Sequence, residues 1–406
     1  MSEAGELGVR DVLRIPEIRA AMLGTFIIML GFGIVSPILP LYARTFGVSL
    51  DAVGVLIAAF SFARLALDPF TGALTDRLGE RGAVVVGAVI VGVSSGLAAI
   101  APTFTLLVVF RGAGGAGSAI FFAGIMSYLL RTIPAERLGR VMGVWYASFN
   151  VGIIAGEPLG GLFAHWLGPV STLWVYGVTC FVSAAVFSRT IHPPPHASDG
   201  PMRSTGIRHL RWDRPFVTVL AANGAYAWVV AGVYSTLLPV FARDEAGLSF
   251  LGIGVGLAVA SLTEFAVLFP AGKATDRIGR RAVLVPSYAA IAVSLLLWPL
   301  AATPALFMVG SGLFGILTGY GGVPQAPMLS DLTTEQTQRT AVAVYRFVGD
   351  LGFVLGPLVA GWSAGLWGYA VAFPLSAVPV VIALGLLLSI GETLRPLPRT
   401  GEAAGL

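Results

Sequence analysis

The stretch TGALTDRLGERGAVV, residues 71–85, interrupts a long apolar run with charged residues and glycines. The stretch PAGKATDRIGRRAVL, residues 270–284, repeats its frame 200 positions later. The repeated residues are Gly72, Asp76, Arg77, Gly79 and Arg81, which return as Gly272, Asp276, Arg277, Gly279 and Arg281. Because glycine permits a sharp turn, we expect each stretch to be a short loop between two helices. Its recurrence predicts a chain made of two related halves.

The apolar runs that flank these loops are long enough to cross a membrane. Hydrophobic residues make up 56% of the 406 residues and charged residues 11%, whereas about a quarter of a soluble domain is charged. Runs of about 20 apolar residues span a bilayer core. The sequence therefore predicts an all-α membrane protein with twelve transmembrane helices, near residues 20–43, 52–73, 82–101, 103–130, 140–163, 170–190, 216–241, 250–271, 282–301, 303–329, 340–366 and 369–390.

The basic residues predict the orientation of these spans. Twenty of the 25 lie on the side that holds both termini, and the other side holds Arg44 and Arg243. Because Lys and Arg flanking the spans stay in the cytoplasm, we expect both termini to be cytoplasmic. The basic balance thus reflects topology, and we expect no nucleic-acid partner. The first nineteen residues lack the apolar core of a signal peptide, and 24 of the 25 basic residues are Arg, which favours a bacterial inner membrane.

A polar, Pro- and Arg-rich stretch at residues 189–215 separates the sixth span from the seventh. It predicts a cytoplasmic linker between two pseudo-symmetric six-helix bundles. Six is an even number, so the halves share one orientation, and parallel repeats of this kind hold substrate near the midplane between them. The predicted organisation is a cytoplasmic N-terminal segment 1–19, a bundle 20–190, a linker 191–215, a bundle 216–390 and a cytoplasmic tail 391–406.

The motifs resemble those of the major facilitator superfamily over nearly the whole chain. The pattern Gly72-x-x-x-Asp76-Arg77-x-Gly79-x-Arg81 resembles that family's signature loop between helices 2 and 3. The stretch RGAGGAGSA, residues 111–119, resembles its helix 4 motif, with Gly114 where Gln is common. The resemblance implies a major facilitator fold and a transport function.

Two further motifs resemble those of the twelve-helix drug/proton antiporters. They are LGFGIVSPILP, residues 30–40, in helix 1, and GIIAGEPLGG, residues 152–161, in helix 5. The second departs from the pattern, because Glu157 takes the usual Pro position and Pro158 follows one residue late. A second departure is Arg131 at the end of span 4, where the family often has an acid.

The signature loop predicts a gate. The resemblance implies that Gly72, Asp76, Arg77 and Arg81 lock the cytoplasmic helix ends in one state of the cycle, with Asp76 near the positive end of span 11. The alternative is that the arginines only anchor the topology of the loop.

Ionisable side chains inside spans are costly and indicate function. The sequence places seven there, namely Arg64, Asp68, Arg111, Glu157, Glu264, Arg346 and Asp350. In the family, helices 2 and 11 face each other, so we predict gating bridges from Asp68 to Arg346 and from Arg64 to Asp350 that close the cytoplasmic side when the site opens outward. The alternative is pairing within each helix, since both pairs are spaced i,i+4.

Three of these residues are predicted to couple transport to protons or cations. Arg111 and Glu157 lie at similar depth in adjacent spans, so we expect an ionised, structural or relay-like pair. Glu264 has no basic residue near it in its own helix, and an unpaired carboxyl in an apolar setting can exchange a proton near neutral pH. The alternative is that Glu264 only wets a central cavity.

Aromatic residues on the cavity-lining helices predict a site for flat, lipophilic compounds. The alternative for each ring is ordinary packing or interfacial anchoring. The predicted substrate-binding residues are Phe32, Phe121, Phe122, Asn223, Tyr226, Trp228, Tyr234 and Tyr320.

Together these features predict a monomeric secondary active transporter, a proton-coupled exporter of small lipophilic or cationic compounds that works by alternating access. The alternative is a major facilitator symporter or uniporter for a metabolite, lipid or sugar. The energy source is a proton gradient, and we expect no cofactor and no metal. The spans show no nucleophile–base pair or metal-ligand cluster, so we expect no enzymatic activity.

Overall fold

The computed structural model describes residues 16–133, 135–191, 206–334 and 336–394, and within these ranges its regular elements are all helical. The first half comprises α2 (Pro16–Val35), α3 (Leu39–Arg44), α4 (Leu50–Ala99), α5 (Phe104–Thr132), α6 (Ala135–Leu167) and α7 (Val170–Thr190). The second half comprises η1 (Ile207–His209), α8 (Arg214–Trp228), η2 (Val229–Leu237), α9 (Leu238–Asp244), α10 (Phe250–Ile278), α11 (Arg280–Leu297), η3 (Trp298–Leu300), α12 (Pro304–Gly322), α13 (Gln325–Asp331), α14 (Gln338–Trp367), α15 (Tyr369–Ser376) and α16 (Val378–Leu388).

The described helices account for the twelve predicted spans. Ten helical stretches are long and apolar enough to cross a membrane. One of these, α4, is 50 residues long and covers both the second and the third predicted spans. The predicted fifth span is α6, which is 33 residues long and is not among these ten stretches. The predicted all-α fold is therefore confirmed.

The two signature stretches are tighter than the loops expected from the sequence. In the first half Gly79 has φ +70° and is the residue that departs from helical geometry within α4. In the second half Gly279 has φ +114° and separates α10 from α11. A side chain would strain this left-handed backbone, so one glycine per half suffices to turn the chain.

Helix starts also recur at the 200-residue interval. Thr103 Oγ1 accepts a hydrogen bond from the Leu106 amide at the start of α5, and Thr303 caps α12 through Leu306 in the same way. Such caps satisfy an amide that has no partner within the helix. The repeat read from the sequence therefore extends to the local hydrogen bonds that start the helices.

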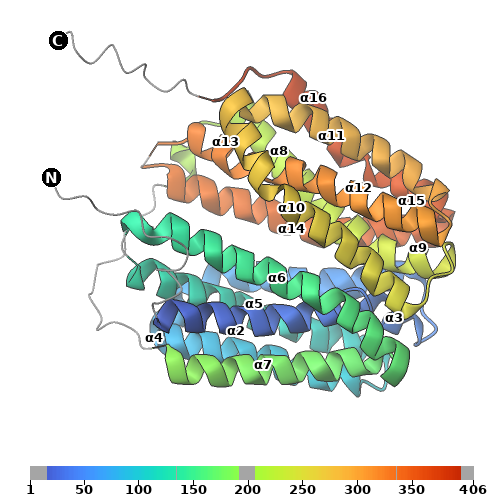
Figure 1. Ribbon diagram of the computed structural model, residues 1–406. Coiled ribbons are helices and arrows are strands. Elements are labelled where there is room, and N and C mark those ends of the chain that lie inside the picture. Colours follow the sequence, from blue (N-terminus) through green and yellow to red (C-terminus); the bar gives the residue numbers. More distant parts are fainter. Residues whose placement is uncertain (1–15, 134, 192–205, 335, 395–406) are drawn as a thin grey trace, which may run out of the picture.

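The two halves form two bundles that lie side by side (Figure 1). One buried core is built from residues between 18 and 191 and the other mainly from residues between 210 and 390. We call the end that holds Thr132, Thr190 and Arg214 the linker end. The end that holds Arg44 and Asp244 is the opposite end, where α3 and α9 lie together (Figure 1).

Glycines bring the halves into backbone contact toward the opposite end. A Cβ on Gly54 of α4 would overlap the Pro357 carbonyl oxygen of α14, and one on Gly254 of α10 would overlap the Glu157 carbonyl oxygen of α6. These are equivalent contacts, because 54 and 254, like 157 and 357, differ by 200. Close backbone approach through small residues is a common way to pack membrane helices.

An ion pair joins the halves beyond these glycines. Arg44 Nη1 lies 3.3 Å from Asp244 Oδ2, and the Tyr369 hydroxyl donates to the same oxygen at 2.7 Å. The structure is therefore closed at the opposite end.

Candidate functional site

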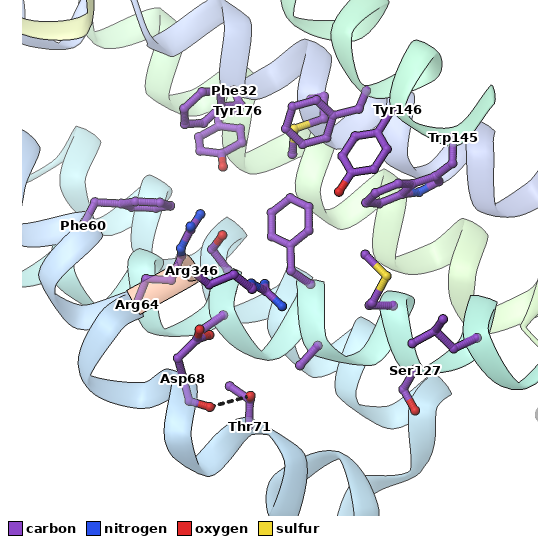
Figure 2. Close-up of a pocket in the computed structure, with 18 residues that line it drawn as sticks. Phe32, Phe60, Arg64, Asp68, Thr71, Ser127, Trp145, Tyr146, Tyr176 and Arg346 are labelled. Carbon is purple, nitrogen blue, oxygen red and sulfur yellow. Dashed lines mark hydrogen bonds between the residues drawn. The ribbon is translucent and has the colours of Figure 1, made fainter. Parts of the chain in front are cut away.

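A cavity of about 650 Å³ lies where the first half faces Arg346 of the second half, and it reaches toward the linker end. Figure 2 shows the residues that line it. Leu130, near the linker end of α5, lines it and is 53% exposed. Arg346 is the lining residue that comes from the second half. The other lining residues are Met29, Phe32, Phe60, Arg64, Asp68, Thr71, Ser118, Ala119, Phe122, Ala123, Met126, Ser127, Leu130, Trp145, Tyr146, Phe149 and Tyr176.

Of the eight predicted substrate-binding residues, Phe32 and Phe122 line this cavity. Phe121 is instead buried against Phe187, and its side chain is 1% exposed. Asn223 donates to the Tyr345 carbonyl oxygen. Tyr226, Trp228, Tyr234 and Tyr320 are likewise absent from the lining.

The lining rings that sequence reasoning missed come mainly from α6. Trp145, Tyr146 and Phe149 lie in its linker-end half and line the cavity, and Figure 2 shows Trp145 and Tyr146 beside it. Their signal in the sequence is the stretch VWYASFN, residues 144–150, because Phe149 follows Trp145 by four residues and Tyr146 by three, so it neighbours both on the helix surface.

A cross-half ion pair lies on the wall of the cavity. Arg64 Nη2 lies 2.5 Å from Asp350 Oδ1, so α4 is joined to α14, and this predicted contact is present. Asp68 and Arg346 line the same cavity (Figure 2), but the described residues show no ion pair between them within 4.0 Å. The bridge was predicted for the state in which the site opens outward, and that state stays a prediction. The bridge is present while the cavity reaches the linker end, because it lies at mid-depth and does not close that end.

The four predicted gating residues of the signature loop, Gly72, Asp76, Arg77 and Arg81, are exposed. The Asp76 side chain is 74% exposed, and its ion-pair partner is Arg131 at 3.9 Å. In this structure the predicted contact of Asp76 with the start of span 11 is therefore not made, since the side chain is exposed and pairs with a residue of its own half.

The buried charge of the signature loop is Glu80, which sequence reasoning did not select. Its Oε1 lies 2.9 Å from Arg131 Nη1 and accepts from the Ser127 hydroxyl at 3.3 Å. At the equivalent positions of the second half, Arg280 Nε lies 3.0 Å from Asp331 Oδ2. Both pairs tie the turn to the end of a neighbouring helix, with the charges exchanged.

The predicted pair between Arg111 and Glu157 is absent, and this expectation was wrong. Glu157 is fully buried and bonds across the halves to Tyr234 of η2, whose hydroxyl contacts Oε1. Ser261 of α10 donates to the same oxygen at 3.1 Å. Oε2 has no hydrogen-bond partner among the described residues. Similar depth in adjacent helices did not ensure contact, because the Glu157 side chain points to the second half.

The structure pairs Arg111 with no carboxylate among the described residues. Its guanidinium carbon is 4.8 Å from the centre of the Phe60 ring, and its Nε has no hydrogen-bond partner among the described residues. The residue is 4% exposed and lines a second, smaller cavity of about 110 Å³.

Glu264 is held inside the second half. Tyr226 donates to its Oε1 at 2.9 Å and Thr318 to its Oε2 at 3.2 Å. Glu264 does not line the large cavity, so the alternative that it wets that cavity is not what the structure shows. The two hydroxyls satisfy the carboxyl, and the described residues give it no basic partner within 4.0 Å.

The family model of the Major Facilitator Superfamily matches residues 21–267 and 234–405. The chain belongs to the major facilitator superfamily. It is a multi-pass membrane transporter of that family, as the resemblance of its motifs implied.

Curated relatives include proteins of drug resistance. The quinolone resistance protein NorA of Staphylococcus aureus (strain Mu50 / ATCC 700699) is 25% identical over 238 residues, which cover 57% of this chain and 60% of NorA. The match thus spans less than two thirds of that relative. A chloramphenicol resistance protein of Streptomyces lividans is 26% identical over 366 residues, covering 87% of this chain and 90% of that protein.

Solved structures share the fold at low identity. A bacterial homologue of the human lysosomal transporter Spinster, in an inward-facing and occupied conformation, has a TM-score of 0.77 and 17% identity and covers 95% of this chain and 97% of that chain. A mutant of the nucleoside transporter NupG has a TM-score of 0.78 and 13% identity and covers 92% of this chain and 99% of that chain. These likenesses show that the chain shares the fold of these proteins.

Proposed function

We propose that this transporter exports small lipophilic or cationic compounds from a bacterial cytoplasm in exchange for protons. The observation that carries the proposal is the cavity of about 650 Å³ between the halves, which is closed toward the opposite end and reaches the linker end. The linker end is the cytoplasmic side in this proposal, because the basic residues flank the spans there. Rocking of the two bundles about the cavity provides alternating access.

The lining of the cavity supports a lipophilic or cationic substrate. Seven aromatic rings and two methionines supply an apolar, polarisable wall. Aromatic faces attract cations, and the Asp68 carboxylate lies on the same wall. The Arg64 charge is offset by Asp350. The names of the two relatives above, which refer to quinolone and chloramphenicol resistance, agree with this substrate class.

Proton coupling is assigned in this proposal to two glutamates, Glu157, which is fully buried, and Glu264, which is partly exposed. Glu264 accepts hydrogen bonds from two hydroxyls and has no basic partner within 4.0 Å among the described residues. Glu157 bridges the halves through Tyr234, so a change in its charge acts directly on the contact between them. Arg111, the third residue considered for coupling, is left out of the proton path because no carboxylate in the described part of the chain pairs with it.

Everted membrane vesicles with an acidified lumen test the proposal. Ethidium, a flat lipophilic cation, should accumulate in vesicles that carry the wild-type protein, and collapse of the pH gradient should release it. Glu264→Gln keeps the size of the side chain and removes the exchangeable proton, so accumulation should be lost. The matched control is Glu245→Gln, because Glu245 is exposed at the opposite end.

A second candidate function is supported by Arg346. Its guanidinium lines the large cavity, and the described residues give it no ion pair within 4.0 Å, which suits an anionic metabolite carried by symport or uniport. Uptake of an organic anion, lost in Arg346→Gln and kept in Glu264→Gln, would replace the exporter proposal with this one.

A further inference from the structure

A second, smaller cavity adjoins the large cavity, and five polar side chains line it. Its volume is about 110 Å³, which at ~30 Å³ per water is room for about three or four waters. The polar lining consists of Arg64, Arg111, Ser36, Ser61 and Ser235. No carboxylate belongs to this lining.

The two guanidinium groups in this small cavity differ in how their charge is compensated. Arg64 is paired with Asp350 on the other half. Arg111 is more than nine-tenths buried, is paired with no carboxylate among the described residues, and has an Nε without an acceptor. Its guanidinium lies over the face of the Phe60 ring, which offsets only part of a full charge.

Arg111 cannot avoid the energetic cost of a buried, unpaired charge by losing its proton. Its guanidinium stays charged in proteins, and a buried, unpaired charge is strongly destabilising. The other charged group at similar depth, Glu157, is turned away toward Tyr234 and Ser261. The described residues therefore supply no carboxylate as a counter-charge to Arg111.

We propose that the small cavity is a binding site for one small monovalent anion, held by Arg111 with the hydroxyls of Ser36 and Ser61. Neither of these hydroxyls has a hydrogen-bond partner in the described part of the chain, so both can donate to an anion. The net charge of the lining, after Arg64 is paired with Asp350, is that of one cation, which matches a ligand of charge −1. This site is independent of the compound that occupies the large cavity.

The ligand has two possible sources with the same chemistry. Chloride from solution fits within the cavity together with water. The carboxylate group of a transported compound is the second source, because the two cavities adjoin at Phe32, Phe60 and Arg64, which line both.

The experiment measures the thermal unfolding of the purified full-length protein. The buffer contains sodium gluconate, whose anion is too large for the small cavity, and chloride, bromide or formate replaces gluconate at constant ionic strength. A ligand that binds the folded state raises Tm with a saturable dependence on concentration. We expect a rise of about 2–5 °C in the wild type and none in Arg111→Gln. Arg208→Gln, at an exposed position in η1, should keep the full rise.

A second variant keeps the test decisive if Arg111→Gln does not fold. Ser61→Asp places a carboxylate in the cavity, so the variant should have the Tm of the anion-bound wild type already in gluconate and should not respond to added anion. A bromide soak of crystals should give an anomalous peak beside Arg111 in the wild type and none in Ser61→Asp.

The probe anions also identify the source. A response to chloride and bromide assigns an inorganic anion, whereas a response to formate alone assigns a carboxylate group. A response that is equal in the wild type, Arg111→Gln and Ser61→Asp, or the absence of a response to all three anions, overturns the proposal. None of these readouts involves transport, so the result is separate from the fate of the exporter proposal.

Discussion

Arg131 Nη1 lies 2.9 Å from Glu80 Oε1, and this pair has a counterpart of opposite polarity in the second half. There Arg280 occupies the position of Glu80 and Asp331 that of Arg131, with 3.0 Å between Nε and Oδ2. The exchange explains why a base stands at the end of the fourth span, where the family often has an acid. Both halves keep an ion pair at this place, but the positions of the positive and the negative residue are exchanged.

The first prediction concerns this pair. Glu80→Arg places a second guanidinium beside Arg131, and burying an unpaired charge costs about 3–5 kcal/mol. We expect a large fall in Tm and in transport. Adding Arg131→Glu restores the attraction and most of both quantities. The control is Asp76→Asn, which should change the free energy of unfolding by no more than about 0.5 kcal/mol because Asp76 is exposed. A double variant no better than Glu80→Arg alone would exclude the pairing as a source of stability.

The second prediction concerns the bridge at mid-depth. Asp350→Asn leaves the Arg64 guanidinium without its counter-charge, and transport should fall at least about tenfold, which corresponds to about 1.4 kcal/mol. The exchange Arg64→Asp with Asp350→Arg should recover part of the rate, and the coupling energy from the double-mutant cycle should be about 1–3 kcal/mol.

Asp68 and Arg346 provide the comparison for this bridge. They share the cavity wall and form no ion pair with each other within 4.0 Å in this state. If Arg346→Asp is inactive and added Asp68→Arg restores transport, the two residues pair in another state of the cycle. If nothing is restored, the predicted second bridge loses its support.

The third prediction concerns Glu157 and its partners from the second half. Glu157→Gln keeps the hydrogen bonds to Tyr234 and Ser261 and removes the ionisable proton. We expect substrate exchange between two equal pools to continue, while accumulation driven by a pH gradient is lost. Tyr234→Phe should instead weaken closure at the opposite end and leave gradient-driven transport reduced. Normal gradient-driven accumulation by Glu157→Gln would remove this residue from the coupling path.

The fourth prediction concerns the glycine contacts toward the opposite end. Gly254→Val places a side chain against the backbone of Glu157 and Gly161, so the halves cannot approach and the opposite end should stay open. A cysteine introduced at Ser235 should then react several-fold faster with a membrane-impermeant thiol reagent added from that side. Gly385→Ala, where a Cβ has open space, should leave the reaction rate unchanged. Equal rates in both variants would contradict closure by glycine packing.

The fifth prediction concerns pH and Glu392, which lies after the last span. Burial raises the pKa of this carboxyl, but hydrogen bonds from the Leu394 backbone amide and from the amides at the start of α11 outweigh that effect, and the pKa is lowered. A lowered pKa in the folded state gives stability that is present above the unfolded value of about 4.3 and is lost as the pH falls through the folded value. Glu392→Gln should therefore lower Tm at pH 7 and have little effect near pH 3. An equal loss at both pH values would refute the charge-dependent cap.

The architecture and one cross-half contact followed from the sequence because each depends on spacing. Apolar length predicts spans, and the 200-residue repeat predicts equivalent helices. The facing of helices 2 and 11 placed Arg64 opposite Asp350. In each case the position along a helix was sufficient information, and side-chain direction was not needed.

The rest of the site depends on the direction in which a side chain points. The pairing expected for Glu157 failed because η2 adopts a π-helical form and presents Tyr234 to that carboxyl. Nothing in the apolar stretch around Tyr234 marks that local widening. Likewise, the rings of α6 were overlooked because the choice of cavity-lining helices followed the family resemblance and not the clustering of Trp145, Tyr146 and Phe149.

The contact between Arg44 and Asp244 has a consequence for the ancestry of the molecule. The two residues stand at the same place in each repeat and meet across the pseudo-twofold axis. A dimer of two identical halves would bring like charges together there, arginine against arginine or aspartate against aspartate. This ion pair can therefore exist only after fusion and divergence of the ancestral gene. In a chain built from two copies of one half, two like charges would repel each other at the place where the present chain is closed.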